Sequence, residues 1–558
     1  MPEMILPGVY IDVRPEGLIV PGQFASGNIG ITGTASKGLP GVPTLLGSYA
    51  DAVQHFGNYD AWIDGQSNEL TLVRALELAY NQGATTVFAV RIAGNSAAPA
   101  KTQLGQQVAN LTAKSPGEWG NGLAYNVSPA EQDAIVKNEP VDTSGATLKL
   151  LHSPIVKNAH NRILFNNRVL KIGYDDGAGH TDPLQSGGVT VKTTDGTLTF
   201  PPGEGPQQND KTLFATYAVD RSKAVKVTLR LGQAVEAFTV VDGNDLAKDI
   251  NDPFSGSAWV IADTNGLANA NTLPALSADK TTFTPFSGGD NGAAGADYPA
   301  GLNALIDQDV QIIIAAGQDD SFGNTLDAHC QSASTDAVQR DRVAVVGSKP
   351  IPTGQTIEPI INHTLDSDRV IFVAPGIVTT DNAAVPPANV TLPGAYAAAA
   401  VAGLLSSFEP HISLTNKVLP VNGLERQYSR AELTQLVEAR VLALELHLGF
   451  HIVRGITTST NTAFAQITTR RIVDYAKNGV RSAANPYIGL LNNERVRGAL
   501  RATINSFLAG MVNAEMLISY DLDVTATRDQ EIRGIVQVTM VLRPVFSIDF
   551  IQVTMFLE

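Results

Sequence analysis

The chain has 558 residues, 44% of them hydrophobic and 17% charged, so we expect a globular protein of several domains. Its net charge of −15 argues against a general nucleic-acid binder, which would normally be basic. The single cysteine, Cys330, excludes an internal disulfide framework and a thiolate metal cluster, and its amphipathic helical surroundings, LDAHCQSA, predict a packed thiol.

Neither a signal peptide nor a membrane helix is expected. Residues 1–7 lack a basic start and an apolar core. No apolar run approaches the roughly 20 residues that a membrane helix needs. We therefore expect a soluble protein made in a reducing cytoplasm, without direct membrane insertion.

The first 25 residues are interrupted repeatedly by proline and glycine. Between these breakers lies a short strand pattern from Val9 to Val13. A strand bracketed by breakers near a terminus favours an extended arm over a core element. Residues 1–25 are therefore predicted to be an N-terminal linker arm.

Residues 26–100 predict the first part of a core domain with alternating strands and helices. A buried strand is expected at 28–35, a helix from about Leu70 to Tyr80 with Ser67 as N-cap, and a strand at 85–92. The segment after the first strand invites comparison with a phosphate-binding loop. The match fails because Ser36, and not glycine, precedes Lys37.

Residues 101–285 lose helical periodicity and contain short β-like runs separated by Asp-Gly turns. We predict an inserted β-rich outer domain. From 286 to 448 strands and helices alternate again, with apolar runs at 310–316, 342–347 and 369–375 that are typical of strands covered on both faces. Ser429 opens a capping box, which predicts a helix through about Leu448.

The predicted fold is therefore mixed α/β, with a helix-flanked core sheet, the inserted β-rich domain and terminal strand arms. No glycine-rich fingerprint follows any predicted core strand. His447 and His451 have helical spacing but lack the glutamate of a zinc motif, and we find no nucleophile elbow. We predict no catalytic, cofactor-binding or metal-binding residue.

Residues 449–543 reverse the charge of the chain. Between Phe450 and Arg501, eight basic residues stand against two acidic ones, a balance of about +6 (eight minus two). Within this segment 493–512 is predicted to be a helix with Val496, Leu500 and Ile504 on its apolar stripe. The charge reversal favours contact with an acidic partner, and the alternative is an ordinary solvated helical face.

The chain ends with two near-copies of one strand, 535–542 (IVQVTMVL) and 550–557 (FIQVTMFL). Apolar and polar residues alternate with period two in both copies. Two interpretations remain at this point: a final hairpin within the protein's own sheet, or a strand donated to a neighbouring copy. Residues 544–558 are predicted to be the C-terminal linker strand.

Several short segments, in this order along the chain, resemble those of contractile tail sheath proteins, which form the outer cylinder of contractile phage tails and phage-tail-like injection systems. The matching segments are Pro7–Ile11, Ser115–Asn121, Ser287–Gly292, Leu414–Asn416, Ile452–Thr457 and the closing strand–proline–strand. The resemblance covers both ends and most of the middle, and it is weakest in the inserted region.

The resemblance implies that each terminal arm adds a strand to a small sheet of a neighbouring subunit. The donated strands would contain Val9, Tyr10, Ile11, Val13, Phe550, Ile551, Val553, Met555 and Leu557. The receiving sheet would contain Val536, Val538 and Met540. A basic helical segment would face the inner tube through Arg495, Arg497 and Arg501 first, and through Arg470, Arg471 and Lys477 second.

The implied partners are other copies of the chain in a helical polymer of stacked rings, an inner tube protein, and baseplate and terminal cap proteins. No nucleic acid and no cofactor are implied. The particle would be assembled in the bacterial cytoplasm. The alternatives are a cofactor-binding α/β enzyme, which needs a ligand fingerprint, and another self-assembling shell protein, which needs neither strand arms nor a charge reversal.

Overall fold

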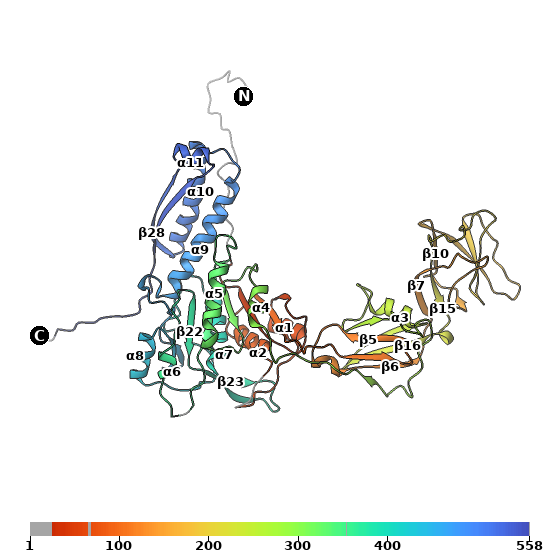
Figure 1. Ribbon diagram of the computed structural model, residues 1–558, viewed down its shortest axis with the longest axis horizontal. Helices are drawn as coiled ribbons and strands as arrows, with labels where there is room; N and C mark the ends of the chain where they lie inside the picture. The colour runs from red at the N-terminus through yellow and green to blue at the C-terminus, as the bar shows by residue number, and fades with distance from the viewer. Residues whose placement is uncertain (1–24, 65–68, 353, 557–558) are drawn as a thin grey trace, which may run out of the picture. The chain divides into compact units, whose positions relative to one another are not determined.

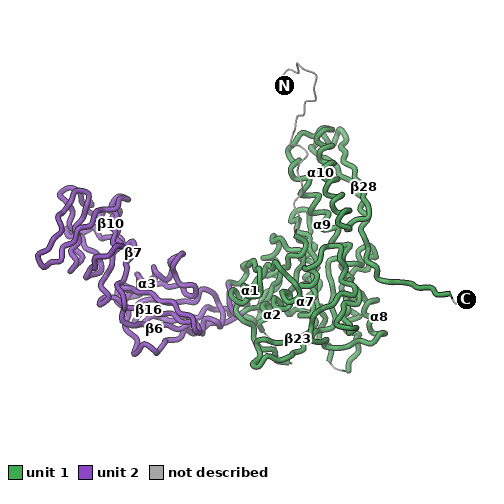
Figure 2. The backbone as a smooth tube through the Cα atoms, turned by 180° about the vertical axis from the view of Figure 1, so that it is seen from behind, with its two compact units in different colours: residues 1–35, 39–94, 293–558 green, residues 36–38, 95–292 purple. Residues whose placement is uncertain are grey.

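The computed structural model describes residues 25–64, 69–352 and 354–556. These residues form two compact units (Figure 2). The first contains the described parts of 1–35, 39–94 and 293–558, and the second contains 36–38 and 95–292. The predicted helix cap Ser67, the predicted N-terminal strand with Val9, Tyr10, Ile11 and Val13, and Leu557 lie outside the described residues.

The first unit is built on an eight-stranded mixed sheet of order β2-β3-β1-β20-β21-β22-β26-β27. Its strands are β1 (Ile29–Thr34), β2 (Pro43–Leu46), β3 (Val87–Ile92), β20 (Ile312–Ala315), β21 (Val343–Gly347), β22 (Val370–Ala374), β26 (Leu442–Leu446) and β27 (Phe450–Ile452). The strands from β3 to β26 run parallel, and β2 and β27 pair antiparallel at the two edges. The parallel strands are almost wholly buried because helices cover both faces.

Alternate side chains of each central strand enter two hydrophobic layers. Ile312 and Ile314 pack into one layer, and Ile313 packs into the other. The first layer is covered by α1 (Tyr49–Phe56), α2 (Leu72–Asn81) and α7 (Gly394–Ser406). The second is covered by α4 (Tyr298–Ala304), α5 (Gly323–Ala333), α6 (Glu358–Ile361) and α8 (Arg430–Glu438). Cys330 is fully buried in the second layer, as its helical pattern predicted.

The predicted helix from Ser429 to about Leu448 is wrong in its second half. The capping box at Ser429 is present, but α8 ends at Glu438. Arg440 adopts a positive φ of 65°, which stops the helix, and the apolar residues that follow form β26 and β27. His447 and His451 therefore lie on a β-hairpin and not on one helix face.

The first unit also contains a small three-stranded sheet, and both units contain short 3-10 turns. The sheet contains β23 (Ile377–Asp381), β24 (Ala388–Leu392) and β25 (Gly423–Leu424). The 3-10 turns of both units are η1 (Glu118–Gly122), η2 (Arg221–Lys223), η3 (Asp320–Phe322), η4 (Thr462–Phe464) and η5 (Asn485–Tyr487).

The second unit is β-rich and has two hydrophobic cores. The first core lies between β4 (Lys101–Leu104), β5 (Ala109–Ala113), β6 (Leu123–Pro129), β16 (Val225–Leu231), β17 (Ala234–Val240), β18 (Val260–Asp263), β19 (Thr284–Pro285) and helix α3 (Gly243–Ile250). The second lies among β7 (Ala134–Pro140), β8 (Leu148–Lys149), β9 (Ile155–Val156), β10 (Arg162–Phe165), β11 (Arg168–Val169), β12 (Lys171–Asp175), β13 (Gly188–Lys192), β14 (Thr197–Thr199) and β15 (Leu213–Val219). The loss of helical periodicity in this region reflects that strand content.

The C-terminal part of the first unit is two long helices with a two-stranded sheet along them, which we call the C-terminal lobe (Figure 1). It comprises α9 (Ile467–Ala484), α10 (Glu494–Asn513), β28 (Leu517–Thr525), α11 (Arg528–Ile532) and β29 (Gln537–Pro544). Leu500 and Ile504 of α10 are buried between the helices and the sheet, on the stripe that the sequence predicted, and Leu508 one turn further is buried with them. Asn493 caps α10 by accepting a hydrogen bond from the amide of Val496.

Close packing of α9 on α10 at Gly479 gives a testable consequence. A Cβ at this position would overlap the ring of Phe507. We expect Gly479→Ala to lower the free energy of unfolding by about 1–3 kcal/mol, because the overlap forces side chains off their preferred rotamers. Gly510→Ala on α10 is the control, since its Cβ would meet no atom within 4 Å and should be neutral or slightly stabilising. Equal losses in urea unfolding would contradict the packing.

Candidate functional site

The sheet of the C-terminal lobe has one face on the helices and one face in solvent. Residues Leu522 and Met540 form a cross-strand pair, as do Val524 and Val538, and these side chains lie on the helix-facing side. Val536 belongs to the same apolar layer. All of these side chains keep part of their surface exposed, so the layer is not closed over by the two strands.

Both long edges of this sheet are open in the described part of the chain. Strands β28 and β29 pair with each other over eight registered positions, and no other described strand pairs with either. An open edge presents unpaired backbone donors and acceptors and is a template for a further strand. The sheet can therefore accept a strand at each edge.

The second copy of the repeated strand has no place in the protein's own sheet. From Phe550 to residue 556 no strand or helix is formed, and Phe550, Ile551, Val553 and Met555 are 79%, 83%, 73% and 84% exposed. The first copy pairs with β28 instead. A final hairpin between the two copies, one of the two interpretations of the sequence, is therefore not formed.

The exposed segment begins at a fixed point, the carboxylate of Asp549. Its side chain is only 6% exposed. Arg454 donates through Nε to Oδ2 at 2.9 Å, Thr415 donates through its hydroxyl to Oδ1 at 3.1 Å, and Gln466 donates through Nε2 to Oδ2 at 3.2 Å. The guanidinium of Arg454 also lies over the ring of Phe550, 5.3 Å from its centroid.

Sequence reasoning missed the role of Asp549. A signal was present, because Asp549 is the one charged residue between Arg543 and Glu558 in a strongly apolar stretch. An aspartate inside an apolar stretch is expected to be buried with it, and a buried carboxylate needs hydrogen-bond donors or a cation from elsewhere in the protein.

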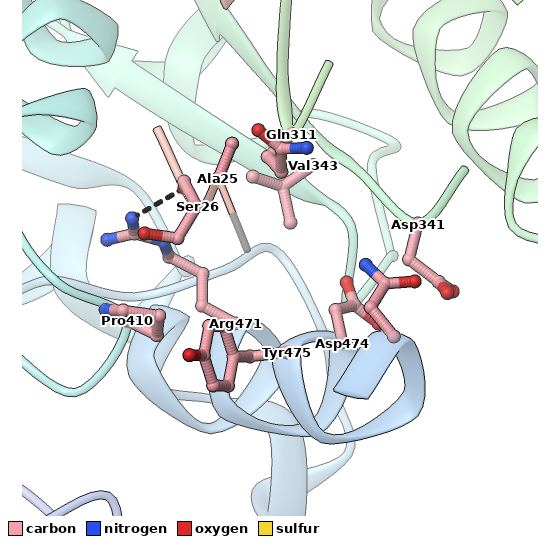
Figure 3. Close-up of a pocket in the computed structure, with 10 residues that line it drawn as sticks. Ala25, Ser26, Gln311, Asp341, Val343, Pro410, Arg471, Asp474 and Tyr475 are labelled. Carbon is pink, nitrogen blue, oxygen red and sulfur yellow. Dashed lines mark hydrogen bonds between the residues drawn. The ribbon is translucent and has the colours of Figure 1, made fainter. Parts of the chain in front are cut away.

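Two of the arginines predicted to contact a tube are buried inside the unit. Arg470 is 7% exposed and pairs with Asp368 at 2.9 Å and with Asp474 at 2.7 Å. Arg471 is 5% exposed and donates to the backbone carbonyls of Phe408 at 2.9 Å and Ser26 at 3.0 Å, where it lines a small pocket (Figure 3). The prediction that these two residues face a partner is therefore wrong.

Lys477 also forms an ion pair inside the first unit. Its partner is the fully buried carboxylate of Asp341. The same carboxylate forms ion pairs with Arg369 at 3.3 Å and with Arg481 at 2.7 Å. Arg369 in turn pairs with Asp474 at 2.9 Å. We call Asp341, Arg369, Asp474 and their basic partners the buried ion network; it joins α9 to the starts of β21 and β22.

Burial and neighbouring charges both act on the pKa of Asp474 in this network, and burial acts on the pKa of Arg471 beside it. Desolvation raises the pKa of Asp474, and the guanidinium groups of Arg369 and Arg470 oppose that shift. Desolvation likewise lowers the pKa of Arg471 to about 10.

The three first-choice arginines lie on the early turns of α10. Arg495 and Arg501 are exposed. Arg497 is less accessible, because it bonds Asn492 at 2.9 Å and Glu531 of α11 at 3.0 Å. Hydrogen bonds from Arg528 and Arg497 lower the pKa of Glu531. Of the six predicted contact residues, Arg495 and Arg501 are thus the ones with exposed side chains.

The charge reversal seen along the sequence does not persist in space. The cations at 454, 470, 477 and 497 are matched by carboxylates from distant parts of the chain, at 549, 368, 341 and 531. A charge count over consecutive residues therefore overstated the positive surface.

Among the residues that the structure describes, no group of three or more His, Cys, Asp or Glu side chains is arranged to hold a metal ion. In the same residues, no helix combines the length and the apolar character that crossing a membrane requires.

The buried ion network makes a prediction about stability. Replacing Asp341 by Asn leaves Arg369, Lys477 and Arg481 without their shared carboxylate, so we expect a loss of about 3–5 kcal/mol in the free energy of unfolding. Asp336→Asn is the matched control, because Asp336 also pairs with Arg481 but is fully exposed, and should cost at most about 1 kcal/mol. Denaturant unfolding of the two variants measures the difference, and similar losses would contradict a structural role for the network.

Comparison with solved structures identifies relatives of this fold. The sheath tail protein of Desulfitobacterium hafniense aligns over 97% of both chains with a TM-score of 0.59 and 16% identity. The sheath tail protein Lin1278 of Listeria innocua aligns over 95% of both chains with a TM-score of 0.58 and 13% identity. At these identities the likeness shows a shared fold. Among curated protein sequences, none matches the chain.

Two protein-family models match consecutive parts of the chain. Residues 291–458 match the phage tail sheath protein central domain, and residues 459–558 match the phage tail sheath C-terminal domain. The two matches adjoin, and together they contain most of the parallel sheet, the whole C-terminal lobe and the exposed final segment. Residues 291–558 therefore carry the central and C-terminal domains of the phage tail sheath protein family.

Proposed function

We propose that this sheath subunit polymerises by donating its final strand, residues 550–557, to the sheet of the C-terminal lobe in a neighbouring copy. The observation that carries the proposal is the exposed apolar segment after Asp549. Main-chain hydrogen bonds supply the linkage in such strand addition, and alternate side chains supply the register. In this proposal 1–25 and 544–558 are the two linker arms, and 449–543 is the C-terminal sheath domain.

Exposing the apolar side chains of residues 550–556 to water is unfavourable in an isolated subunit. Each side chain on one face of it is apolar, and large exposed apolar surfaces mark interaction sites. A strand of this composition with both edges open would also recruit other chains. Insertion into a neighbour's sheet covers the side chains and pairs the backbone at once.

The receiving sheet fits the donated strand in composition. In β29, Val538 and Met540 point to the helices while Gln537 and Thr539 point to solvent. The final segment repeats the order Gln-Val-Thr-Met, so Val553 and Met555 correspond to Val538 and Met540. Because a strand shows alternate side chains to opposite faces, Ile551, Val553 and Met555 would extend the same half-covered apolar layer.

The proposal also assigns roles to the N-terminal strand, the exposed arginines and the ends of the polymer. The N-terminal strand 9–13 would take a second open edge of the sheet. Arg495 and Arg501, with Arg497 beside them, would contact an inner tube, and exposed ion pairs of about 0–1 kcal/mol each suit a contact that must release. Baseplate and cap proteins would bind the ends of the polymer.

The proposed mechanism is mechanical and assigns no catalytic or cofactor role to any residue. Subunits would stack as rings around the tube in an extended state, assembled in the bacterial cytoplasm as part of a phage tail or injection particle. On a signal from the baseplate, each subunit would change its packing while the exchanged strands keep neighbours linked. The energy would come from the difference between two packings, with no nucleotide.

Removal of the final segment tests strand donation. A chain ending at Asp549 keeps the carboxylate and its donors, and it loses only side chains that contribute little burial to their own subunit. We expect its unfolding midpoint to match that of the full chain, whereas tubes should be absent in negative-stain electron microscopy. Tubes formed by this shortened chain would overturn the proposal.

The face of the strand can be tested with two charged substitutions. Val553→Asp would place a charge in the apolar layer, while Thr554→Asp adds the same charge on the opposite face. We expect the first to raise the critical concentration for assembly at least about tenfold, and the second to leave it within about threefold. Sedimentation of the polymer measures both values. Equal sensitivity at the two positions would rule out the proposed face.

A further inference from the structure

We propose that Asp549 is a positioning residue for assembly: it fixes the start of the donated strand to the core of its own subunit, so that the strand leaves from one defined point. This inference rests on the strand donation proposed above. It concerns where the strand begins and how firmly that beginning is held.

The donors that hold Asp549 come from three separate parts of the first unit. Thr415 lies in the loop after α7, Arg454 follows β27, and Gln466 is the N-cap residue of α9. Gln466 also accepts from the amide of Ser547 at 3.3 Å and donates to the carbonyl of Ser547 at 3.4 Å. The hydroxyl of Ser547 donates to Asp549 Oδ1 at 3.3 Å. The residues just before the strand are thus docked at the junction of the core sheet and the C-terminal lobe.

The loops that carry Thr415 and Arg454 hold each other in place. The amide of Gly455 donates to the hydroxyl oxygen of Thr415 at 3.1 Å, and the amide of Asn416 donates to the carbonyl of Ile452 at 2.8 Å. Asn416 has a φ of 60°, a left-handed conformation that asparagine tolerates well. Both donors are therefore set by backbone contacts.

These loops are two of the segments that carry the sequence resemblance, 414–416 and 452–457. The resemblance assigned them no role. Their convergence on one buried carboxylate supplies one, since each contributes a donor to the point from which the final strand departs.

No flexible residues separate the buried carboxylate of Asp549 from the start of the repeated strand. The repeated strand begins at Phe550, one residue after Asp549, and consecutive Cα atoms are about 3.8 Å apart. A neighbour's sheet must therefore lie directly beside this junction. The four residues before Asp549 are also held by hydrogen bonds. The amide of Val545 donates to the carbonyl of Met516, and the amide of Ser547 donates to the side chain of Gln466.

Assembly of three full-length variants tests the inference. Asp549→Ala removes the fixed point, and a Gly-Ser-Gly-Ser insertion between Asp549 and Phe550 keeps it but adds slack. Both should raise the critical concentration for tube formation about tenfold or more, because added freedom lowers the effective concentration of the strand. Asp336→Ala, which removes a fully exposed carboxylate outside the C-terminal lobe, is the control and should assemble normally.

A distance measurement separates positioning from general destabilisation. Spin labels would be placed at Gln552→Cys and at the exposed Gln435→Cys of α8, in a Val553→Asp background that is expected to stay unassembled. Native Cys330 is buried, and desolvation raises its pKa to about 12, so it should not be labelled. Asp549→Ala should broaden the distance distribution in electron–electron double resonance, and Asp336→Ala should not.

The outcomes distinguish this inference from the function on which it rests. If the chain ending at Asp549 forms no tubes but Asp549→Ala and the insertion variant assemble like the wild type, strand donation stands and the positioning role is overturned. An unchanged distance distribution in Asp549→Ala would overturn it as well. Loss of assembly in both variants, together with a broadened distribution, is the result that the inference requires.

Discussion

Beyond the carboxylate of Asp549 the chain carries apolar side chains that its own fold does not cover. Ser547 and Asp549 are tied into the first unit, and the side chains from Phe550 to Phe556 on both faces of the segment are exposed. An apolar strand of this kind needs a partner sheet, and the C-terminal lobe presents a sheet with two open edges and a half-covered apolar face. In the proposed strand donation, donor and acceptor would both be present in one sequence, which is the requirement for an open-ended polymer of identical subunits.

The remainder of the first unit holds these two features in a fixed relation. The parallel sheet is buried on both faces, and the starts of β21 and β22 are joined to α9 by the buried ion network. The loops that follow α7 and β27 meet at Asp549. Asp549 is therefore joined to the core sheet, and the core sheet is joined through the buried ion network to α9 of the C-terminal lobe.

Sequence reasoning predicted the parts of the fold that depend on local pattern. The apolar runs at 310–316, 342–347 and 369–375 became β20, β21 and β22, because strands buried on both faces must be apolar at every position. The alternation at 535–542 correctly indicated which side chains of β29 face the helices. The capping box at Ser429 marked the start of α8 but could not mark its end, which depends on the positive φ of Arg440.

Features that depend on contacts between distant segments were not predictable from one sequence. The strand partner of β29 is β28, in which Asp521 and Asp523 alternate with apolar residues; that alternation predicts a strand but does not identify its partner. Arg470 and Arg471 were predicted to lie on a surface because the carboxylate and carbonyl partners that bury them lie elsewhere in the chain. Three donors of Asp549, namely Thr415, Arg454 and Gln466, are likewise separated from it by 83 to 134 residues.

Electron cryo-microscopy of tubes assembled from the purified chain tests the central claim most directly. The account predicts continuous density from Asp549 into the β28–β29 sheet of a neighbouring subunit, with Ile551, Val553 and Met555 against the helices of that neighbour. Density that places residues 550–557 in the sheet of their own subunit, or outside any sheet, would contradict it.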